Sequence, residues 1–341
     1  MDQTLQVIRG TLYGQAIGDA FGMPGELWSR AKIQDYFGEI NDFLDGPESN
    51  EVAKNFTKGQ FTDDTATALV ILDSLIATDF QPKQADIAEK LIQWGEVNQA
   101  FEKEIFGPST KAALLGMRAG KCREELGVIT NQAITNGSAM RISPIGLLFT
   151  PDEATALIDY VTEITATTHS SDVAIAGAVV VAGAVSYFTQ GRDWADMLEF
   201  VYHLHDLALS KGAETYQASI KERIKLGINL AHRFQNADQL FLQAVYDLLG
   251  TTTLITESVP AALAIAYYAQ DVTHCAKLCA NLGGDTDTIG CMACAICGAY
   301  QGFDQIDSAW VELIDEANAV NLENYAQAIY TRFKEEGKLY E

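Results

Sequence analysis

The chain has 341 residues, enough for one large domain or two of ordinary size, and 48% of them are hydrophobic while 20% are charged. This composition excludes a disordered, collagenous or disulfide-stapled protein. The formal net charge of −23 would repel phosphate backbones and anionic lipid, so we expect neither nucleic acid nor a membrane as a partner. No feature of the sequence identifies a protein partner.

Two features bear on where the protein works. The chain has only six cysteines, and its start, MDQTLQVIRG, lacks the basic-then-apolar layout of a signal peptide. We therefore expect a cytoplasmic protein. The longest apolar stretch, residues 173–185, is shorter than the roughly 20 residues that a membrane-spanning helix requires, so it is interpreted as a buried helix.

Apolar residues recur at helical spacing along almost the whole chain, whereas no comparable series of alternating strands occurs. Short Gly and Pro punctuation separates these segments, and none of it is long enough to be a linker. We predict a single all-α domain over residues 1–341. The clearest repeats, in chain order, are Leu69, Leu72, Leu75 and Ile76; Trp194, Met197, Leu198 and Val201; Tyr216, Ile220, Ile224 and Ile228; and Leu322, Tyr325, Ile329 and Phe333.

Three of the expected helices are apolar on nearly every face and built from small residues. They cover residues 173–185, 259–269 and 289–300. A helix that is hydrophobic all round has to be surrounded by other helices, and Ala and Gly allow backbones to approach closely. These three segments are predicted to form the centre of the molecule.

Two Asp-rich motifs stand directly before apolar helices. The first is residues 61–65, FTDDT, and the second is residues 283–288, GGDTDT. One interpretation is helix capping, because Thr and Asp accept hydrogen bonds from the free N–H groups of a first helical turn and acidic residues there suit the helix dipole. Two such motifs with paired Asp also suggest a shared metal site.

If both helix starts face the same space, four carboxylates come together there: those of Asp63, Asp64, Asp285 and Asp287. Their mutual repulsion would raise their pKa values unless cations neutralise it, and two divalent ions would balance four negative charges. Asp and Thr offer only hard oxygen ligands. This donor set favours Mg²⁺ or Mn²⁺ over Zn²⁺.

Two other enzyme classes use aspartate motifs of this general kind. Phosphatases of the haloacid dehalogenase type place DxD at the end of a hydrophobic strand, whereas here the motif follows Leu282-Gly283-Gly284 and precedes a helix. Isoprenoid synthases carry DDxxD, which would need an Asp at Thr67. Neither pattern is met.

The chain resembles the ADP-ribosylglycohydrolases, a family that includes the ADP-ribosyl-acceptor hydrolases, the dinitrogenase reductase-activating glycohydrolase and the J1 crystallins. The paired TDDT and GGDTDT motifs, in that order and at that separation, are the most specific part of the resemblance. The matching segments are GQAIGDAFGMPGE (14–26), FTDDTATAL (61–69), NGSAMRISPIG (136–146), THSSDVAIAGA (168–178), ESVPAALA (257–264) and GGDTDTIGCMACAICGA (283–299).

The resemblance implies a compact, orthogonal all-α bundle with a binuclear Mg²⁺ or Mn²⁺ centre that hydrolyses the bond between ADP-ribose, or a related nucleoside or ribosyl group, and its acceptor. Such chemistry suits the site, because two cations can position ribose hydroxyls and water. A non-catalytic, crystallin-like binder and a magnesium-dependent phosphohydrolase are the alternatives. The metal ligands that the family's motifs imply are Thr62, Asp63, Asp64, Asp285, Asp287 and Thr288.

Two acidic residues near the start of the chain have expected roles. Glu26 matches the family's early G-x-P-x-E pattern, and we assign it to positioning or deprotonating the attacking water. Asp19 lies in an Ala- and Gly-rich helix, where a carboxylate is costly to bury without a partner. Rather than binding a metal itself, Asp19 could support the residues that do.

Residues 136–141, NGSAMR, offer backbone N–H groups, a hydroxyl and a cation, a composition able to bind a diphosphate or a ribose. Alone, such a segment is a turn. The resemblance implies substrate contacts here and at the histidine that precedes Ser170-Ser171-Asp172. The expected substrate-binding residues are Gly137, Ser138, Met140, Arg141 and His169.

The sequence leaves the acceptor open and argues against a cysteine site. Several better-known hydrolases of the family carry an Asp in the segment after their second long helix, and no Asp of residues 101–110 aligns with it. Cys291, Cys294 and Cys297 recur every three residues inside a helix that is already expected to be buried. Free Cys is a common small core residue, so we predict that these thiols only pack.

Overall fold

The structure is a computed structural model that describes residues 2–191 and 193–339. Within these ranges it contains seventeen α-helices and five single 3₁₀ turns. No strand forms there, and only three isolated backbone bridges occur. The predicted all-α fold is therefore confirmed.

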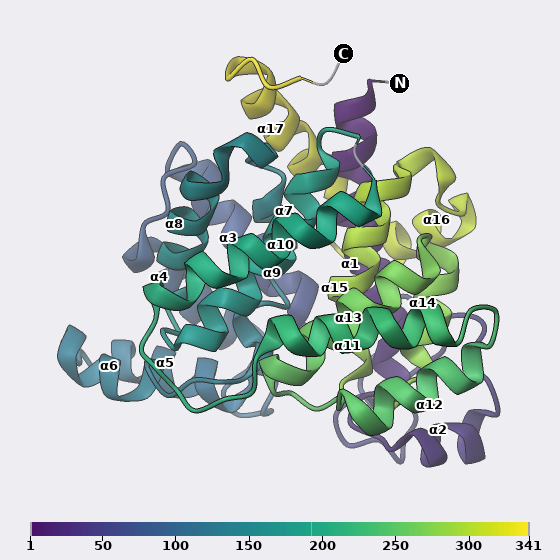
Figure 1. The fold of residues 1–341 in the computed structure, drawn as a ribbon. Helices are drawn as coiled ribbons and strands as arrows, with labels where there is room; N and C mark the ends of the chain where they lie inside the picture. The colour runs from purple at the N-terminus through teal and green to yellow at the C-terminus, as the bar shows by residue number, and fades with distance from the viewer. Residues whose placement is uncertain (1, 192, 340–341) are drawn as a thin grey trace.

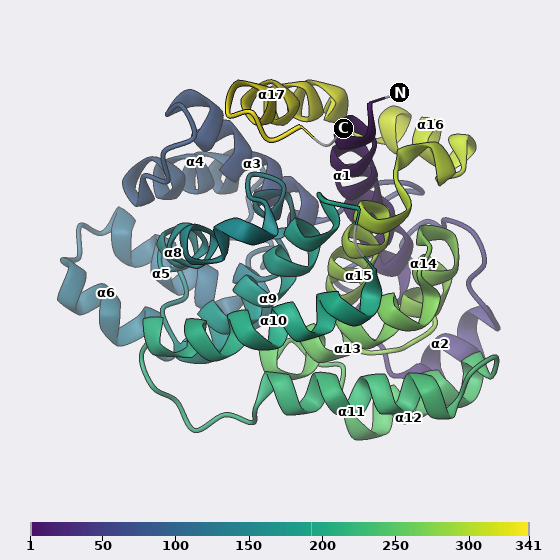
Figure 2. The same ribbon diagram turned by 45° about the horizontal axis from the view of Figure 1, so that its top comes forward.

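Most elements follow one another with short connections, whereas residues 38–62 form a long loop between the second and third helices, as Figures 1 and 2 show. In chain order they are α1 (Gln3–Gly22), η1 (Met23–Gly25), α2 (Arg30–Phe37), α3 (Asp63–Ala77), α4 (Gln84–Val97), α5 (Pro108–Arg118), α6 (Arg123–Thr130), η2 (Asn136–Ser138), α7 (Ser143–Gly146), η3 (Pro151–Glu153), α8 (Ala154–Thr165), α9 (Asp172–Phe188), α10 (Trp194–Ala208), η4 (Leu209–Lys211), α11 (Ile220–Arg233), α12 (Asp238–Leu248), α13 (Ile255–Ala269), α14 (Val272–Ala280), α15 (Thr286–Gln301), η5 (Phe303–Gln305), α16 (Ser308–Ala317) and α17 (Leu322–Glu335).

The three helices predicted at the centre are there. In α9 every residue from Val173 to Phe188 is buried, and in α15 the same holds from Thr286 to Ala299. Helix α13 packs against both of them. No helix of the described residues is both long and apolar enough to cross a membrane, in agreement with the interpretation of residues 173–185 as a core helix.

One of the predicted helical repeats extends beyond the helix that the structure contains. Tyr216 was grouped with Ile220, Ile224 and Ile228, but α11 begins at Ile220, where Ser219 accepts a hydrogen bond from the backbone of Glu222. Tyr216 lies outside the helix and is 98% exposed. Its spacing relative to the three isoleucines is therefore a coincidence of the sequence.

A fourth central helix, α1, packs against α15 along a stripe of glycines. Gly10, Gly14, Gly18 and Gly22 stand four residues apart and so lie on one face of α1. A Cβ atom at Gly18 would lie 2.0 Å from the carbonyl oxygen of Gly290. The backbones therefore touch directly, as in other helix pairs with small residues at their interface.

The two helices run antiparallel. A Cβ atom at Gly10 would meet the backbone of Gly298, and one at Gly22 would meet the backbone of Thr286. The hydroxyl of Thr286 also donates a hydrogen bond to the carbonyl oxygen of Gly22, at 2.7 Å. This packing brings the C-terminal end of α1 next to the N-terminal end of α15.

Candidate active site

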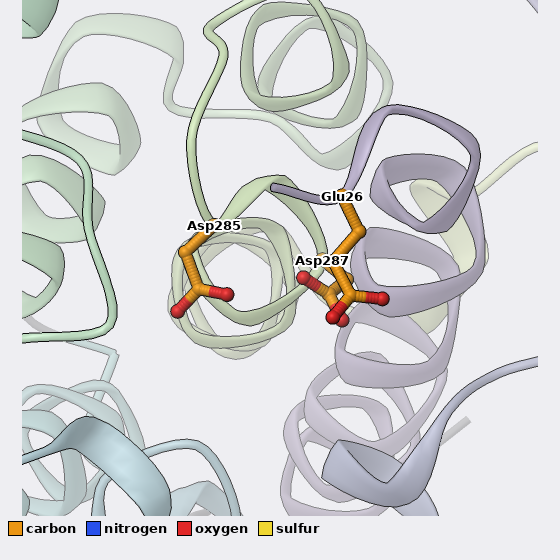
Figure 3. A group of neighbouring side chains, drawn as sticks. All are labelled: Glu26, Asp285 and Asp287. Carbon is orange, nitrogen blue, oxygen red and sulfur yellow. The ribbon is translucent and has the colours of Figure 1, made fainter. Parts of the chain in front are cut away.

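Three carboxylates meet where the end of α1 reaches the start of α15. The ligand oxygens of Glu26, Asp285 and Asp287 all lie within 4.8 Å of one another. Figure 3 shows Glu26 coming from the segment after α1, and Asp285 and Asp287 from the first residues of the α15 region. No other group of His, Cys, Asp or Glu in the described part of the chain has three ligand atoms this close.

The two aspartates of the first motif face the same space. Asp63 and Asp64 begin α3, and both line a cavity of about 90 Å³ together with Glu26, Asp285 and Asp287. The structure thus brings the carboxylates of both Asp-rich motifs to one cavity. Thr288 lines this cavity too, whereas Thr62 does not.

Backbone hydrogen bonds fix the segment that carries Glu26 against the GGD turn. The N–H of Leu27 donates to the carbonyl oxygen of Gly284 at 2.7 Å, and the N–H of Gly284 donates to the carbonyl oxygen of Trp28 at 2.8 Å. The side chain of Asn50 donates to the carbonyl oxygen of Glu26 at 3.0 Å. Glu26 therefore has a defined position although it lies in a loop.

The GGD turn itself needs both glycines. Gly283 and Gly284 have φ values of +86° and +88°, a region that residues with a Cβ rarely adopt. A Cβ atom at Gly284 would also lie 2.2 Å from the carbonyl oxygen of Thr251. The same oxygen accepts the N–H of Asp285 at 2.7 Å, which aims the Asp285 side chain into the cavity region.

Asp19 holds the first Asp-rich motif in place. Its carboxylate is completely buried and accepts the N–H of Thr62 at 2.9 Å, the N–H of Thr65 at 3.0 Å and the hydroxyl of Thr65 at 2.6 Å. Asp19 does not line the cavity. It supports the start of α3 from behind, as the sequence suggested.

Helix capping accounts for only part of the two motifs. The hydroxyl of Thr62 accepts the N–H of Asp64 at 3.3 Å, so Thr62 is an N-cap. Asp285 stands at the N-cap position of α15, but its side chain makes no capping hydrogen bond. Buried oxygens of Asp64 (Oδ2) and Asp287 (Oδ1) have no hydrogen-bond partner within the described part of the chain. Such unpaired buried oxygens are costly unless a cation or a proton satisfies them.

The pKa values of the cluster are raised, mainly because the carboxylates are buried together. Burial and the charge of Asp19 raise the pKa of Asp63 to about 7. Burial raises the pKa of Asp285 to about 6, although hydrogen bonds from Asn136 and Thr288 oppose the shift. The pKa of Glu26 lies well above its usual range because of burial and the charge of Asp285. Five carboxylates in one place thus require protons or cations.

Several residues that line the cavity were missed by the sequence analysis, and Asn136 is one of them. Asn136 donates its side-chain N–H to Oδ2 of Asp285 at 2.5 Å and to the hydroxyl of Ser258 at 3.1 Å, and it lines the cavity. Its own N–H bonds to the carbonyl oxygen of Thr253, another lining residue. Its position at the start of the NGSAMR segment was the available signal.

The five residues expected to bind substrate fall into two groups. Gly137 and Met140 line the cavity. Ser138, Arg141 and His169 do not, and each is at most 2% exposed. Ser138 donates to the carbonyl oxygen of Ala174 at 3.4 Å. The imidazole of His169 lies behind Gly137, where a Cβ atom would be 3.2 Å from its Cε1.

The cysteines are free thiols. Cys122 is exposed and the other five are buried, in α14 and α15. Burial raises the pKa of Cys279, Cys291 and Cys294 well above its usual range, which disfavours the thiolate form that metals bind.

Comparisons with known proteins point to one family. The profile of the ADP-ribosylglycohydrolase family matches residues 1–338 of the chain. The uncharacterised protein YegU of Escherichia coli (strain K12) is 40% identical over 323 residues, which cover 94% of this chain and 96% of that protein. Human ADP-ribosylhydrolase ARH3 is 25% identical over 340 residues, which cover 90% of this chain and 89% of that enzyme.

A solved structure has the same fold. The chain superposes on an ADP-ribosylglycohydrolase-related protein complex with a TM-score of 0.68 at 22% sequence identity. The match covers 97% of this chain and 99% of that one. The similarity therefore extends over the whole bundle rather than over the motifs alone.

Proposed function

The chain belongs to the ADP-ribosylglycohydrolase family and is a hydrolase of glycosidic bonds, and we propose that it releases ADP-ribose, or a related nucleoside or ribosyl group, from an acceptor with the help of two Mg²⁺ ions. Mn²⁺ could take their place. The observation that supports this most directly is the meeting of five carboxylates from three segments at one small cavity.

The donor set fits hard divalent cations. All the candidate ligands are oxygens, and two of them, on Asp64 and Asp287, are buried without a hydrogen-bond partner. We propose that Asp63, Asp64, Asp285, Asp287 and Thr288 hold the metals, with Thr62 completing the set from the N-cap of α3. When bound, the cations would orient ribose hydroxyls and water, and would stabilise the charge that develops during cleavage.

Glu26 is proposed as the acid–base group. It lies in the same group of three carboxylates as Asp285 and Asp287, so it is within reach of a water molecule held there. Burial and the charge of Asp285 raise its pKa, which makes the ionised carboxylate a stronger base than an exposed glutamate. In this scheme the Glu26 carboxylate accepts a proton from the attacking water, while Asn136 keeps Asp285 in place. Its position also permits a role as a ligand.

Gly137 and Met140 are proposed to contact the ribosyl group, because they line the same cavity as the carboxylates. Ser138, Arg141 and His169 would then act from behind the cavity wall. We further propose one domain over residues 1–341, supported by a hydrophobic cluster that extends from Val7 to Ile329. A cytoplasmic location is supported by six free cysteines.

The test uses the protein with saturating Mg²⁺ and three candidate substrates: an ADP-ribosyl-serine peptide, ADP-ribosyl-arginine and O-acetyl-ADP-ribose. Release of free ADP-ribose, measured by chromatography, supports the proposal and identifies the acceptor. The products AMP and ribose phosphate would instead indicate a phosphohydrolase. Tight binding of ADP-ribose without any turnover would indicate a non-catalytic binder. The Glu26→Gln variant should turn over about 10²- to 10⁴-fold more slowly.

A further inference from the structure

Buried and half-buried polar side chains form an unbroken chain of hydrogen bonds that leads to the cavity wall. Nη2 of Arg141 lies 2.6 Å from Oγ1 of Thr168, which lies 2.8 Å from Nδ1 of His169. The other ring nitrogen, Nε2, lies 3.0 Å from Oγ1 of Thr135. That oxygen lies 3.0 Å from Oγ of Ser109. The chain thus runs from a buried cation to the first turn of α5.

The chemistry of the first member gives the chain a direction. A guanidinium has donors and no acceptor, so Arg141 donates to Thr168. Among the residues that the structure describes, the other hydrogen-bond partner of the Thr168 hydroxyl is Nδ1 of His169, and the hydroxyl can satisfy its own hydrogen there only by donating to that nitrogen. Nδ1 must then be unprotonated. The ring proton sits on Nε2 and is donated to Thr135, whose hydroxyl donates to Ser109.

The opposite tautomer would leave a buried group unsatisfied. With the proton on Nδ1, Thr168 would receive hydrogen bonds from both Arg141 and His169, and its own hydrogen would have no acceptor. Thr168 and His169 are completely buried and Arg141 is 2% exposed, so water does not reach these groups from the surface. An unmade hydrogen bond in such a place is costly.

We propose that Arg141 and Thr168 are positioning residues that hold His169 in its Nε2–H tautomer, and that His169 thereby fixes the direction of the Thr135 hydroxyl on the wall of the active site. A single proton on the ring is supported by burial and by the charge of Arg141, which lower the pKa of His169 to about 3. The imidazole is then neutral throughout the physiological range.

Thr135 is the residue through which the His169 tautomer affects the active site. This residue lines the cavity next to Asn136 and Gly137. With its hydrogen committed to Ser109 and one lone pair to His169, its oxygen keeps one lone pair to accept a hydrogen bond from a substrate hydroxyl. Ser109 also joins Thr135 to two residues of α5 that line the cavity, Pro108 and Thr110. This functional consequence rests on the proposed function; the tautomer does not.

The test reads the tautomer directly, by nitrogen-15 NMR of the histidine rings in the metal-loaded protein. The chain has five histidines, and the His169 signals are assigned by their loss in His169→Gln. We expect a protonated-type shift for Nε2 and an unprotonated-type shift for Nδ1. Thr168→Ser keeps the hydroxyl and should preserve this pattern. Thr168→Val removes it and should yield a mixture of tautomers or the Nδ1–H form.

A protonated Nδ1 in the parent protein, or an unchanged pattern in Thr168→Val, would overturn the proposal. If Thr168→Val does not fold, the spectra of the parent and of Thr168→Ser still decide the point. With an active substrate, kcat of Thr168→Val should fall at least about 10-fold at unchanged metal binding, and Thr168→Ser should restore it. If no substrate is cleaved, the proposed function fails while the NMR result stands.

Discussion

At the scale of single residues, the molecule holds more negative charge in its interior than the described residues neutralise. Asp64, Asp285 and Asp287 are each at most 3% exposed, and the nearby cation Arg141 donates a hydrogen bond to Thr168. Burying a carboxylate without a counter-charge is costly, and native proteins tolerate it where function requires it. The carboxylates therefore lower the stability of the metal-free protein.

This imbalance gives a prediction for Asp63→Asn and Asp287→Asn. Each substitution removes one repulsive charge, so the metal-free variants should melt no lower than the metal-free parent. Each also removes a proposed ligand, so Mg²⁺ should raise the melting temperature of the parent by much more than that of either variant. Turnover should fall by orders of magnitude.

Differential scanning fluorimetry with and without Mg²⁺ measures the first effect, and the substrate assay measures the second. Asp35→Asn is the matched control, because Asp35 is exposed on α2 and should change neither quantity. If both site variants keep the full response to Mg²⁺ and full turnover, these aspartates are not ligands and the cation site lies elsewhere.

The sequence indicated the acidic residues that meet in the site better than it indicated the residues that are hydrogen-bonded to them. Asp63, Asp64, Asp285 and Asp287 stand in short motifs with a chemical reason to be paired, and the structure brings them to one cavity. Thr135 belongs to no such motif, and Asn136 stands in the NGSAMR segment, which gave no reason to pair it with an aspartate. Their contribution depends on hydrogen bonds to residues far away in the chain, such as Asp285 and His169, and no local pattern encodes those distances.

At the scale of elements, the site depends on how closely α1 approaches α15. Glu26 follows α1, and Asp285 and Asp287 belong to the start of α15, so a shift between the two helices would separate the carboxylates. The contact is made by backbone atoms across a stripe of glycines. A close-packed interface of this kind has no flexible side chain that could absorb an added methyl group.

We therefore predict that Gly18→Ala lowers both stability and activity. Replacing Gly by Ala inside a helix normally stabilises it by about 1 kcal/mol. Here the new Cβ would lie 2.0 Å from the carbonyl oxygen of Gly290, and the clash should reverse the sign and cost about 1–3 kcal/mol or more. Chemical unfolding measures the change, and the substrate assay shows whether the displaced helix carries Glu26 out of place.

The control for this prediction is Gly127→Ala in α6. A Cβ atom there would meet only the side chain of Asn131, at 3.6 Å, which is ordinary contact. This variant should be as stable as the parent or slightly more stable. Equal effects of the two substitutions would show that helix propensity, rather than the contact with α15, governs Gly18.

A second prediction at this scale concerns the thiols of α15. Cys294 is completely buried, and its Sγ lies 3.9 Å from the carbonyl oxygen of Val272, a weak hydrogen bond. If the cysteines only pack, Cys294→Ala should cost about 1 kcal/mol or less and leave the metal content unchanged. Loss of bound metal, measured by elemental analysis, would show that the thiols belong to a metal site.

The central helices were predictable because their signal is local. An uninterrupted apolar segment such as residues 173–185 has to be buried, whatever surrounds it. The role of α1 was not predicted, because a search for apolar periodicity gives little weight to glycine. The spacing of Gly10, Gly14, Gly18 and Gly22 was the available signal, but it does not say which helix packs against it.

At the scale of the whole molecule, acidic charge lowers stability in two ways. The formal net charge of −23 adds a general repulsion to the local one in the cluster. Both are reduced by protons and by divalent cations. The stability of this protein should therefore respond to pH and to Mg²⁺ together. The raised pKa values of the carboxylate cluster set the pH range of this response.

Without metal, the protein should become less stable as the pH rises from about 5 to about 8. The pKa values of Asp19 and Asp285 are raised from 3.8 to about 6 and that of Asp63 to about 7, so between these limits the folded state binds more protons than the unfolded state. Stability then falls with pH, by up to about 1.4 kcal/mol per pH unit for each extra proton, and levels off above the folded-state pKa values.

Saturating Mg²⁺ should replace those protons, so its effect on the melting temperature should be larger at pH 8 than at pH 6. Melting curves of the parent and of Asp63→Asn, with chelator or with Mg²⁺, test this, and the variant should show a shallower pH dependence. A metal-free parent whose melting temperature rises from pH 5 to pH 8 would show that surface ion pairs, rather than the buried carboxylates, control its stability.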